Sequence, residues 1–156
     1  MSEVVVKPVG VVRSPRKDLT DDFWGDVIVE IHLDPAQFGP EALFGLTDFS
    51  HVEILFLMNQ VDPAKIERGA RHPRERTDWP LVGIFAQRGK ARPNRIGLSR
   101  AAIVGVEGLV LRVQALDAID GTPVLDIKPY MAEFAPIGAT HQPHWANELM
   151  ADYYKP

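Results

Sequence analysis

The residues best suited to chemistry lie in two strings in the middle of the chain, FAQRGKARPNRIGLS at 85–99 and LDAIDGTPVLDIKPY at 116–130. In the second string Asp126, Lys128 and Tyr130 alternate along a predicted strand, so their side chains share one face. A carboxylate, an ammonium group and a phenol on one face can pair with one another as structure or lie at a reaction centre. The residues themselves leave both possibilities open.

Positive charge is concentrated around the first string. Between Lys65 and Arg100 ten basic residues stand against three acidic ones, although the whole chain has a net charge of -4. Such asymmetry is typical of a localised surface that binds a polyanion. Alternatively, these arginines pair with carboxylates of the same chain or of a partner, and Arg92-Pro93-Asn94 is an ordinary surface turn.

Several other kinds of site are disfavoured. The chain has no cysteine, and it lacks a glycine-rich phosphate loop, an HExxH motif and a GxSxG motif. His141 and His144 have no third ligand nearby, so no metal site is expected. Because no run of eighteen apolar residues occurs and the valines at 4–6 are too short for a signal sequence, we expect no membrane segment and a cytoplasmic protein.

The elements that must position these residues are short and mostly extended. A length of 156 residues with 46% hydrophobic side chains fits one globular domain spanning 1–156. About seven β-rich runs separated by turn residues favour a mainly β fold, either a barrel or a sandwich. The predicted strands span 4–12, 26–33, 51–58, 81–86, 96–104, 109–116 and 122–127.

Turns and helices complete this outline. Glycines predict antiparallel hairpins at 105–108 and at Asp120-Gly121. A proline opens one or two helical turns at 40–44, and 143–154 predicts a helix with Trp145, Leu149 and Tyr153 on one stripe, packed against the barrel or a partner subunit. Residues 62–80, with three prolines, predict a long functional loop.

The two strings together resemble the TsaA-like family, also called TrmO or YaeB, of S-adenosylmethionine-dependent tRNA methyltransferases. The family strings read approximately FATRSxxRPNPIGLS and DxxDGTPVxDIKPY. GVVRSP at 10–15 and LTDFSHVEILFLMNQ at 46–60 extend the resemblance over about 4–134. It implies a small antiparallel seven-stranded β-barrel with a few short helices, S-adenosyl-L-methionine as cofactor, tRNA as partner, and a homodimer with cofactor pockets near the subunit interface.

The resemblance also implies which residues bind the cofactor. A carboxylate can accept hydrogen bonds from the ribose or the amino group, an arginine can hold the carboxylate of the methionine moiety, and a leucine can cover the adenine. An ordinary turn remains the alternative for the two aspartates. The implied residues are Asn59, Gln60, Arg88, Leu98, Asp117, Ala118, Ile119 and Asp120.

In the family the acceptor is the N6 nitrogen of a threonylcarbamoyl-modified adenosine beside the anticodon. Transfer from a sulfonium is an in-line displacement that needs no metal, and Asp126 or Tyr130 is the candidate proton acceptor. Trp79 and Phe85 offer stacking surfaces for bases. The candidate substrate-binding residues are Arg71, Arg74, Arg76, Arg92, Asn94 and Lys128.

The chain departs from the family pattern at several positions. Arg95 replaces the second proline of PNP, Gln87-Arg88-Gly89 replaces TRS, Asn59 replaces a histidine, and the PRQ element after the first strand has no match. The C-terminal domain of many relatives is also missing. Two alternatives therefore stay open: a methyltransferase for a small molecule or another RNA, and a non-catalytic S-adenosylmethionine sensor, which the change at Asn59 favours.

Overall fold

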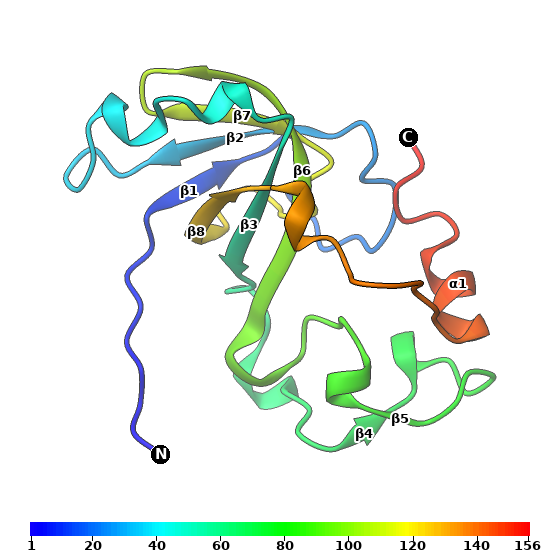
Figure 1. Cartoon of the computed structure of the whole chain (residues 1–156). Coiled ribbons are helices and arrows are strands. Elements are labelled where there is room, and N and C mark those ends of the chain that lie inside the picture. The colour runs from blue at the N-terminus through cyan, green and yellow to red at the C-terminus, as the bar shows by residue number, and fades with distance from the viewer.

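Six antiparallel strands close into a barrel in the computed structural model, which describes residues 1–156 (Figure 1). Around the barrel they follow the order β1, β2, β7, β6, β3 and β8 before closing on β1. The mainly β, antiparallel barrel is therefore confirmed, with six strands in the barrel instead of seven. The strands are β1 Gly10–Arg13, β2 Ile28–Leu33, β3 His51–Leu57, β6 Ile96–Glu107, β7 Val110–Gln114 and β8 Pro123–Pro129.

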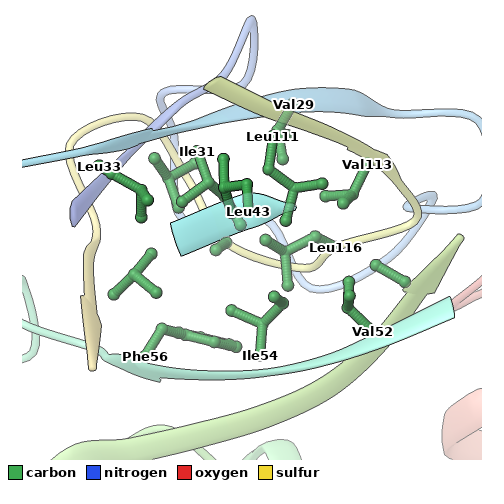
Figure 2. Packing of buried hydrophobic residues seen from close by; sticks show 14 residues of the cluster. Val29, Ile31, Leu33, Leu43, Val52, Ile54, Phe56, Leu111, Val113 and Leu116 are labelled. Carbon is green, nitrogen blue, oxygen red and sulfur yellow. The ribbon is translucent and has the colours of Figure 1, made fainter. Parts of the chain in front are cut away.

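The barrel interior is a single cluster of 14 buried apolar residues. Alternation along the strands supplies most of it, since Val52, Ile54 and Phe56 of β3 point inward while the residues between them face outward. Figure 2 shows two contributions from outside the strands. Leu43 comes from the 3-10 helix η1, Pro40–Leu43, which confirms the helical turn predicted there, and Leu116 follows β7.

The predicted strand at 81–86 is wrong. Only two residues of it, β5 Val82–Gly83, are extended, and they pair with β4 Ala70–Arg71 in a separate two-stranded sheet. A 3-10 helix, η5 Ile84–Ala86, follows directly. Ile84 is buried within this turn, so the apolar run that resembled a strand instead packs as a short helix.

The Asp120-Gly121 turn joins β7 to β8, but the hairpin predicted there is also wrong. β8 pairs with β1 and β3, and not with β7. Leu116, Ala118 and Ile119 are buried and carry the chain across the end of the barrel. The turn bonds to β1 instead, since the Gly121 N–H donates to the carbonyl of Val12 in that strand at 2.8 Å. The hairpin at 105–108 is confirmed between β6 and β7, with Gly108 at a φ of 57°.

Two strands and the C-terminal helix begin or end at residues other than those predicted from the sequence. The first strand begins only at Gly10, and the three valines at 4–6 are exposed. β6 continues to Glu107, beyond the predicted end at 104, because it pairs with both β3 and β7. The helix predicted over 143–154 is shorter, α1 His144–Met150, and turns follow it.

The predicted loop at 62–80 belongs to a lobe below the barrel, drawn in green in Figure 1. It is built from short elements, since its three prolines interrupt regular structure. No helix of the chain has the length and apolar character needed to cross a membrane. The remaining short helices are η2 Leu46–Asp48, η3 Pro63–Lys65, η4 Pro73–Glu75, η6 Pro93–Arg95 and η7 Ala132–Phe134.

Candidate functional site

The carboxylate of Asp117 lies where three distant parts of the chain meet. Asp117 follows β7, and each of its oxygens accepts one side-chain hydrogen bond. The Ser99 hydroxyl on β6 donates to Oδ1, and the Tyr153 hydroxyl near the C-terminus donates to Oδ2. Each oxygen keeps a further lone pair, so a half-buried carboxylate with remaining acceptor capacity lies at this end of the barrel.

Arg88 and Leu98 lie next to this carboxylate. Arg88 donates from Nη2 to the carbonyl of Leu98 at 2.5 Å, and Leu98 immediately precedes Ser99. Burial and the Asp117 charge raise the pKa of Tyr153, while the Arg88 charge opposes this increase. The structure therefore places Arg88 on the backbone carbonyl of Leu98, one residue from the Ser99 that bonds to Asp117, while the Leu98 side chain is exposed on the outer face of β6.

The other three residues of the 117–120 string play different parts. Ala118 and Ile119 are buried, so only their backbone groups are available to a ligand. The Asp120 carboxylate accepts from the Ser14 N–H at 3.0 Å, and the Asp120 N–H donates to the Arg16 carbonyl at 2.8 Å. Asp120 thus fixes the segment after β1 and borders a polar hollow of about 440 Å³ that also includes Arg13 and Lys17.

Asn59 and Gln60 are exposed just beyond the end of β3. No hydrogen bond joins them to Asp117. Their backbone is instead close to Arg95, whose Nη1 donates to the Val61 carbonyl at 3.0 Å. Arg95 therefore stabilises this loop, which gives a structural reason for an arginine where the family has proline.

The other two departures near Arg88 have structural reasons as well. The buried Gln87 amide donates to the carbonyls of Arg71 and Val82, at 3.0 and 2.9 Å, and so joins β4 to β5. Gly89 lies against the Arg71 guanidinium, where an added Cβ would come within 2.8 Å of Nη2. A serine at 89, as in the family, would require the flexible end of the Arg71 side chain to shift.

The two candidate catalytic residues lie on the outer face of β8 and its continuation. Cross-strand register confirms that Asp126 and Lys128 share that face, since they are aligned with the outward-facing Leu55 and Glu53 of β3. Asp126 forms an ion pair with Lys128 at 3.2 Å, and the Arg100 guanidinium stacks 4.7 Å from the Tyr130 ring centre. These groups are therefore internally paired.

The same register aligns Asp126 with Leu98 across the neighbouring strand β3. Leu98 is opposite Leu55, which in turn is opposite Asp126. Two strand spacings separate Leu98 from Asp126, which corresponds to about 10 Å.

The predicted substrate-binding arginines fall into two groups. Arg74 forms a bidentate pair with Asp22, at 2.8 and 3.0 Å, and Arg76 pairs with Asp78 while its guanidinium lies 3.9 Å from the Trp79 ring centre. Arg71 and Arg92 have no carboxylate partner. The Arg71 Nε is buried without a hydrogen bond, and Arg92 donates to the Gln87 carbonyl at 2.7 Å.

Asn94 is exposed with a φ of 62°, a conformation that asparagine tolerates better than most residues. It therefore has a structural role in the turn. The predicted stacking residues also differ: Phe85 is 79% exposed, whereas Trp79 is only 5% exposed and donates from Nε1 to Glu148 at 2.6 Å. Trp79 is therefore unable to stack on a base in this conformation, which contradicts the sequence expectation.

Ser99 and Tyr153 both bond to Asp117, although neither is among the site residues predicted from the sequence. Ser99 occupies an inward-facing position of β6, opposite Ile54, and a hydroxyl buried there needs a partner. The alternation of inward- and outward-facing residues along this strand could therefore have identified Ser99 from the sequence. Tyr153 gave no such signal, because its contact with Asp117 spans 36 residues. No group of three or more His, Cys, Asp or Glu side chains comes together as a metal site.

Comparison with known proteins identifies the barrel. The model of the tRNA-methyltransferase O N-terminal domain matches residues 16–135. The chain belongs to this family. The matched range contains Arg88, Leu98, the 117–120 string and β8, but it excludes the segment that supplies Tyr153.

Individual relatives agree with this assignment. A "probable S-adenosyl-L-methionine-binding protein" of Methanothermobacter thermautotrophicus is 36% identical over 87% of this chain and 96% of its own length. The tRNA (adenine(37)-N6)-methyltransferase of Escherichia coli is 35% identical over 84% of this chain and 59% of its own. A crystal structure of TrmO superposes with a TM-score of 0.72 at 31% identity, over 90% of this chain and 64% of that one. The chain thus spans less than two thirds of the last two proteins.

The paired arginines of this TrmO-family chain predict a stability difference. Replacing Arg74 by methionine leaves the mostly buried Asp22 carboxylate without its bidentate partner. We expect the free energy of unfolding to fall by about 1–2 kcal/mol, measured by urea denaturation. Arg68→Met is the matched control, because the Arg68 side chain makes no ion pair, and it should change stability by less than about 0.5 kcal/mol. Equal effects would contradict a structural role for Arg74.

Proposed function

We propose that the chain is an S-adenosyl-L-methionine-dependent methyltransferase that modifies N6 of the adenosine next to the tRNA anticodon. The observation that carries this proposal is that Arg88 holds the Leu98 carbonyl directly before Ser99, which bonds to Asp117, at one end of a TrmO-family barrel. The E. coli relative is named for this reaction, and the archaeal relative, which has nearly the same length as this chain, is named for binding the cofactor.

The chemistry of the donor set supports S-adenosylmethionine as the ligand. Arg88 uses one N–H group on the Leu98 carbonyl and has others free for the carboxylate of the methionine moiety. Asp117 has lone pairs for a ribose hydroxyl or the amino group, and the side chain of Leu98, 43% exposed, offers an apolar surface to the adenine. When bound, the cofactor supplies an electrophilic methyl group on a sulfonium.

The chain's own contribution to the reaction is alignment and proton handling. Methylation of an N6 nitrogen that bears one hydrogen leaves that proton to be accepted. Asp126 and Tyr130 remain the candidate acceptors, and Asp126 is aligned across β3 with Leu98. Lys128, paired with Asp126, is also a candidate contact for substrate, so substrate binding would release Asp126 from this ion pair.

The test is transfer of label from S-adenosylmethionine to total tRNA from cells with and without threonylcarbamoyl modification. We expect label only in modified tRNA. Arg88→Met should weaken cofactor binding by about 10- to 100-fold, measured by calorimetry, because a charge-assisted hydrogen bond is lost. Lys7→Met, in the exposed segment before β1, is the matched control and should leave affinity unchanged.

Two other functions have distinct outcomes in the same assay. One outcome is that neither RNA becomes labelled but the cofactor turns over when small molecules are supplied. The acceptor would then be a small molecule and not tRNA. Binding without any turnover would identify a sensor, which the asparagine at 59 favours. No binding by folded protein would overturn the proposal.

The unpaired cations of the lower lobe support an RNA-binding surface. Six basic side chains there have no carboxylate within ion-pair distance, and the exposed Phe85 lies in η5, directly after β5 of the same lobe. Phosphates attract such cations, and an unstacked base can pack on an exposed ring. The six residues are Lys65, Arg68, Arg71, Arg88, Arg92 and Arg95.

These cations predict how tRNA affinity depends on salt. Replacing Lys65 and Arg68 together by glutamine should weaken binding of all tRNAs and reduce the slope of log affinity against log salt by about 1–2. Arg74→Gln with Arg76→Gln is the control pair, because both arginines already have carboxylate partners. Equal slopes for the native chain and the Lys65/Arg68 variant would exclude these two residues from the RNA interface.

We also propose a homodimer in the cytoplasm, where its tRNA substrate would be found. The predicted helical stripe is less available than expected, since Trp145, Leu149 and Tyr153 are all partly buried within the chain. The outer face of β6 now supports the dimer better, because it exposes Ile96 and Val104 by 42% and 45%. Light scattering at micromolar concentration should give twice the chain mass of 17.4 kDa. A monomeric mass would contradict the dimer.

A further inference from the structure

The last part of the chain runs along the barrel as a strap, defined here as residues 144–155. Three backbone N–H groups of the segment after β1 donate to it: Phe23 to the Asp152 carbonyl at 3.1 Å, Trp24 to Tyr153 at 2.8 Å, and Gly25 to Lys155 at 3.3 Å. Figure 1 shows the strap, in red, rising from α1 beside the barrel to the C-terminus. It lies outside the residues that match the family.

The strap is held by few interactions. α1 contains no buried residue, and residues 131–143, which connect it to the barrel, are exposed throughout. Apart from the three backbone bonds, it is joined to the rest of the chain by Glu148, which accepts from Trp79, and by Tyr153, which donates to Asp117. Trp145, Leu149 and Tyr153 are only partly buried, whereas the barrel strands contribute fully buried residues, so the strap opens at a lower free energy than those strands.

One of these few interactions occupies the candidate cofactor site. The Tyr153 hydroxyl bonds to Oδ2 of Asp117, and the Tyr154 ring packs edge-on against Tyr153 with ring centres 4.9 Å apart. Both rings lie within the electrostatic reach of Arg88 and Asp117. Because burial raises the pKa of Tyr153, its hydroxyl stays a donor at all ordinary pH values.

We propose that the strap is a gate on the cofactor site, in which the Tyr153 hydroxyl takes the place on Asp117 that a hydroxyl or ammonium group of the cofactor would occupy. This inference rests on the proposed function. A ligand donor that takes the lone pair of Oδ2 used by Tyr153 must displace this hydroxyl, so the free energy of opening the strap reduces the apparent affinity. Binding and strap closure therefore compete.

Gly25 offers a way to release the strap without altering Asp117, Arg88 or Leu98. An added Cβ at this position would lie 1.9 Å from the Tyr154 carbonyl oxygen and 2.8 Å from its carbon. Both are backbone atoms, so the strap itself must move. Gly25→Ala therefore removes the docking of the strap, while Tyr153→Phe removes only its hydrogen bond to Asp117.

The experiment measures S-adenosylmethionine affinity by calorimetry for the full-length native chain and for both variants. We expect each variant to bind about three- to tenfold more tightly, as for removal of one competing hydrogen bond. Tyr154→Phe is the matched control, since the Tyr154 hydroxyl makes no hydrogen bond, and it should stay within twofold of the native chain. Unchanged or weaker binding by Tyr153→Phe overturns the gate and makes Tyr153 a residue that orients Asp117.

Hydrogen exchange gives a second readout on the native protein. If the cofactor displaces the strap, the amides of Phe23, Trp24 and Gly25 lose their acceptors and exchange faster in the presence of saturating S-adenosylmethionine. Slower exchange at these amides would overturn the gate even if the cofactor binds. Failure of the native chain and of both strap-releasing variants to bind would instead overturn the proposed function.

Discussion

Closure of the barrel is the constraint on which the other features depend. Six strands pair edge to edge around 14 buried apolar residues, so no strand edge is left open. Apolar side chains fill most inward-facing positions, so most polar groups that could do chemistry lie at an end of the barrel, on its outer face or in the lobe. The candidate site follows from this, since Asp117 lies on the segment that crosses one end of the barrel.

At that end, one carboxylate joins sequence regions that are otherwise unrelated. Ser99 reaches Asp117 from an inward-facing strand position, and Tyr153 reaches it from the C-terminal strap. Asp120, three residues later, bonds to the chain after β1 instead. The two aspartates of the DAID string therefore bond in different directions: Asp117 joins Ser99 to Tyr153, and Asp120 fixes the segment after β1.

The sequence was sufficient for features that depend on local periodicity and on the family motifs. Antiparallel strands, the 105–108 hairpin and the shared face of Asp126 and Lys128 all follow from these signals. The 81–86 strand failed because a short apolar run has the same composition as a buried 3-10 turn. The Asp120-Gly121 hairpin failed because a turn signal does not determine which strands pair. The Tyr153 contact is invisible locally, since only the closed barrel brings the two residues together.

The net charge of the segment from Lys65 to Arg100 does not reveal which of its cations are free to bind a substrate. The excess of basic residues between Lys65 and Arg100 includes Arg74, Arg76 and Arg100, whose charges are met by Asp22, Asp78 and Glu53. Two of these three acids lie outside the basic segment in the sequence, so a local sum misses them. The cations that remain unpaired gather in the lobe and beside Asp117. An anionic substrate would therefore experience positive charge next to the candidate cofactor site, while the paired arginines hold the lobe in shape.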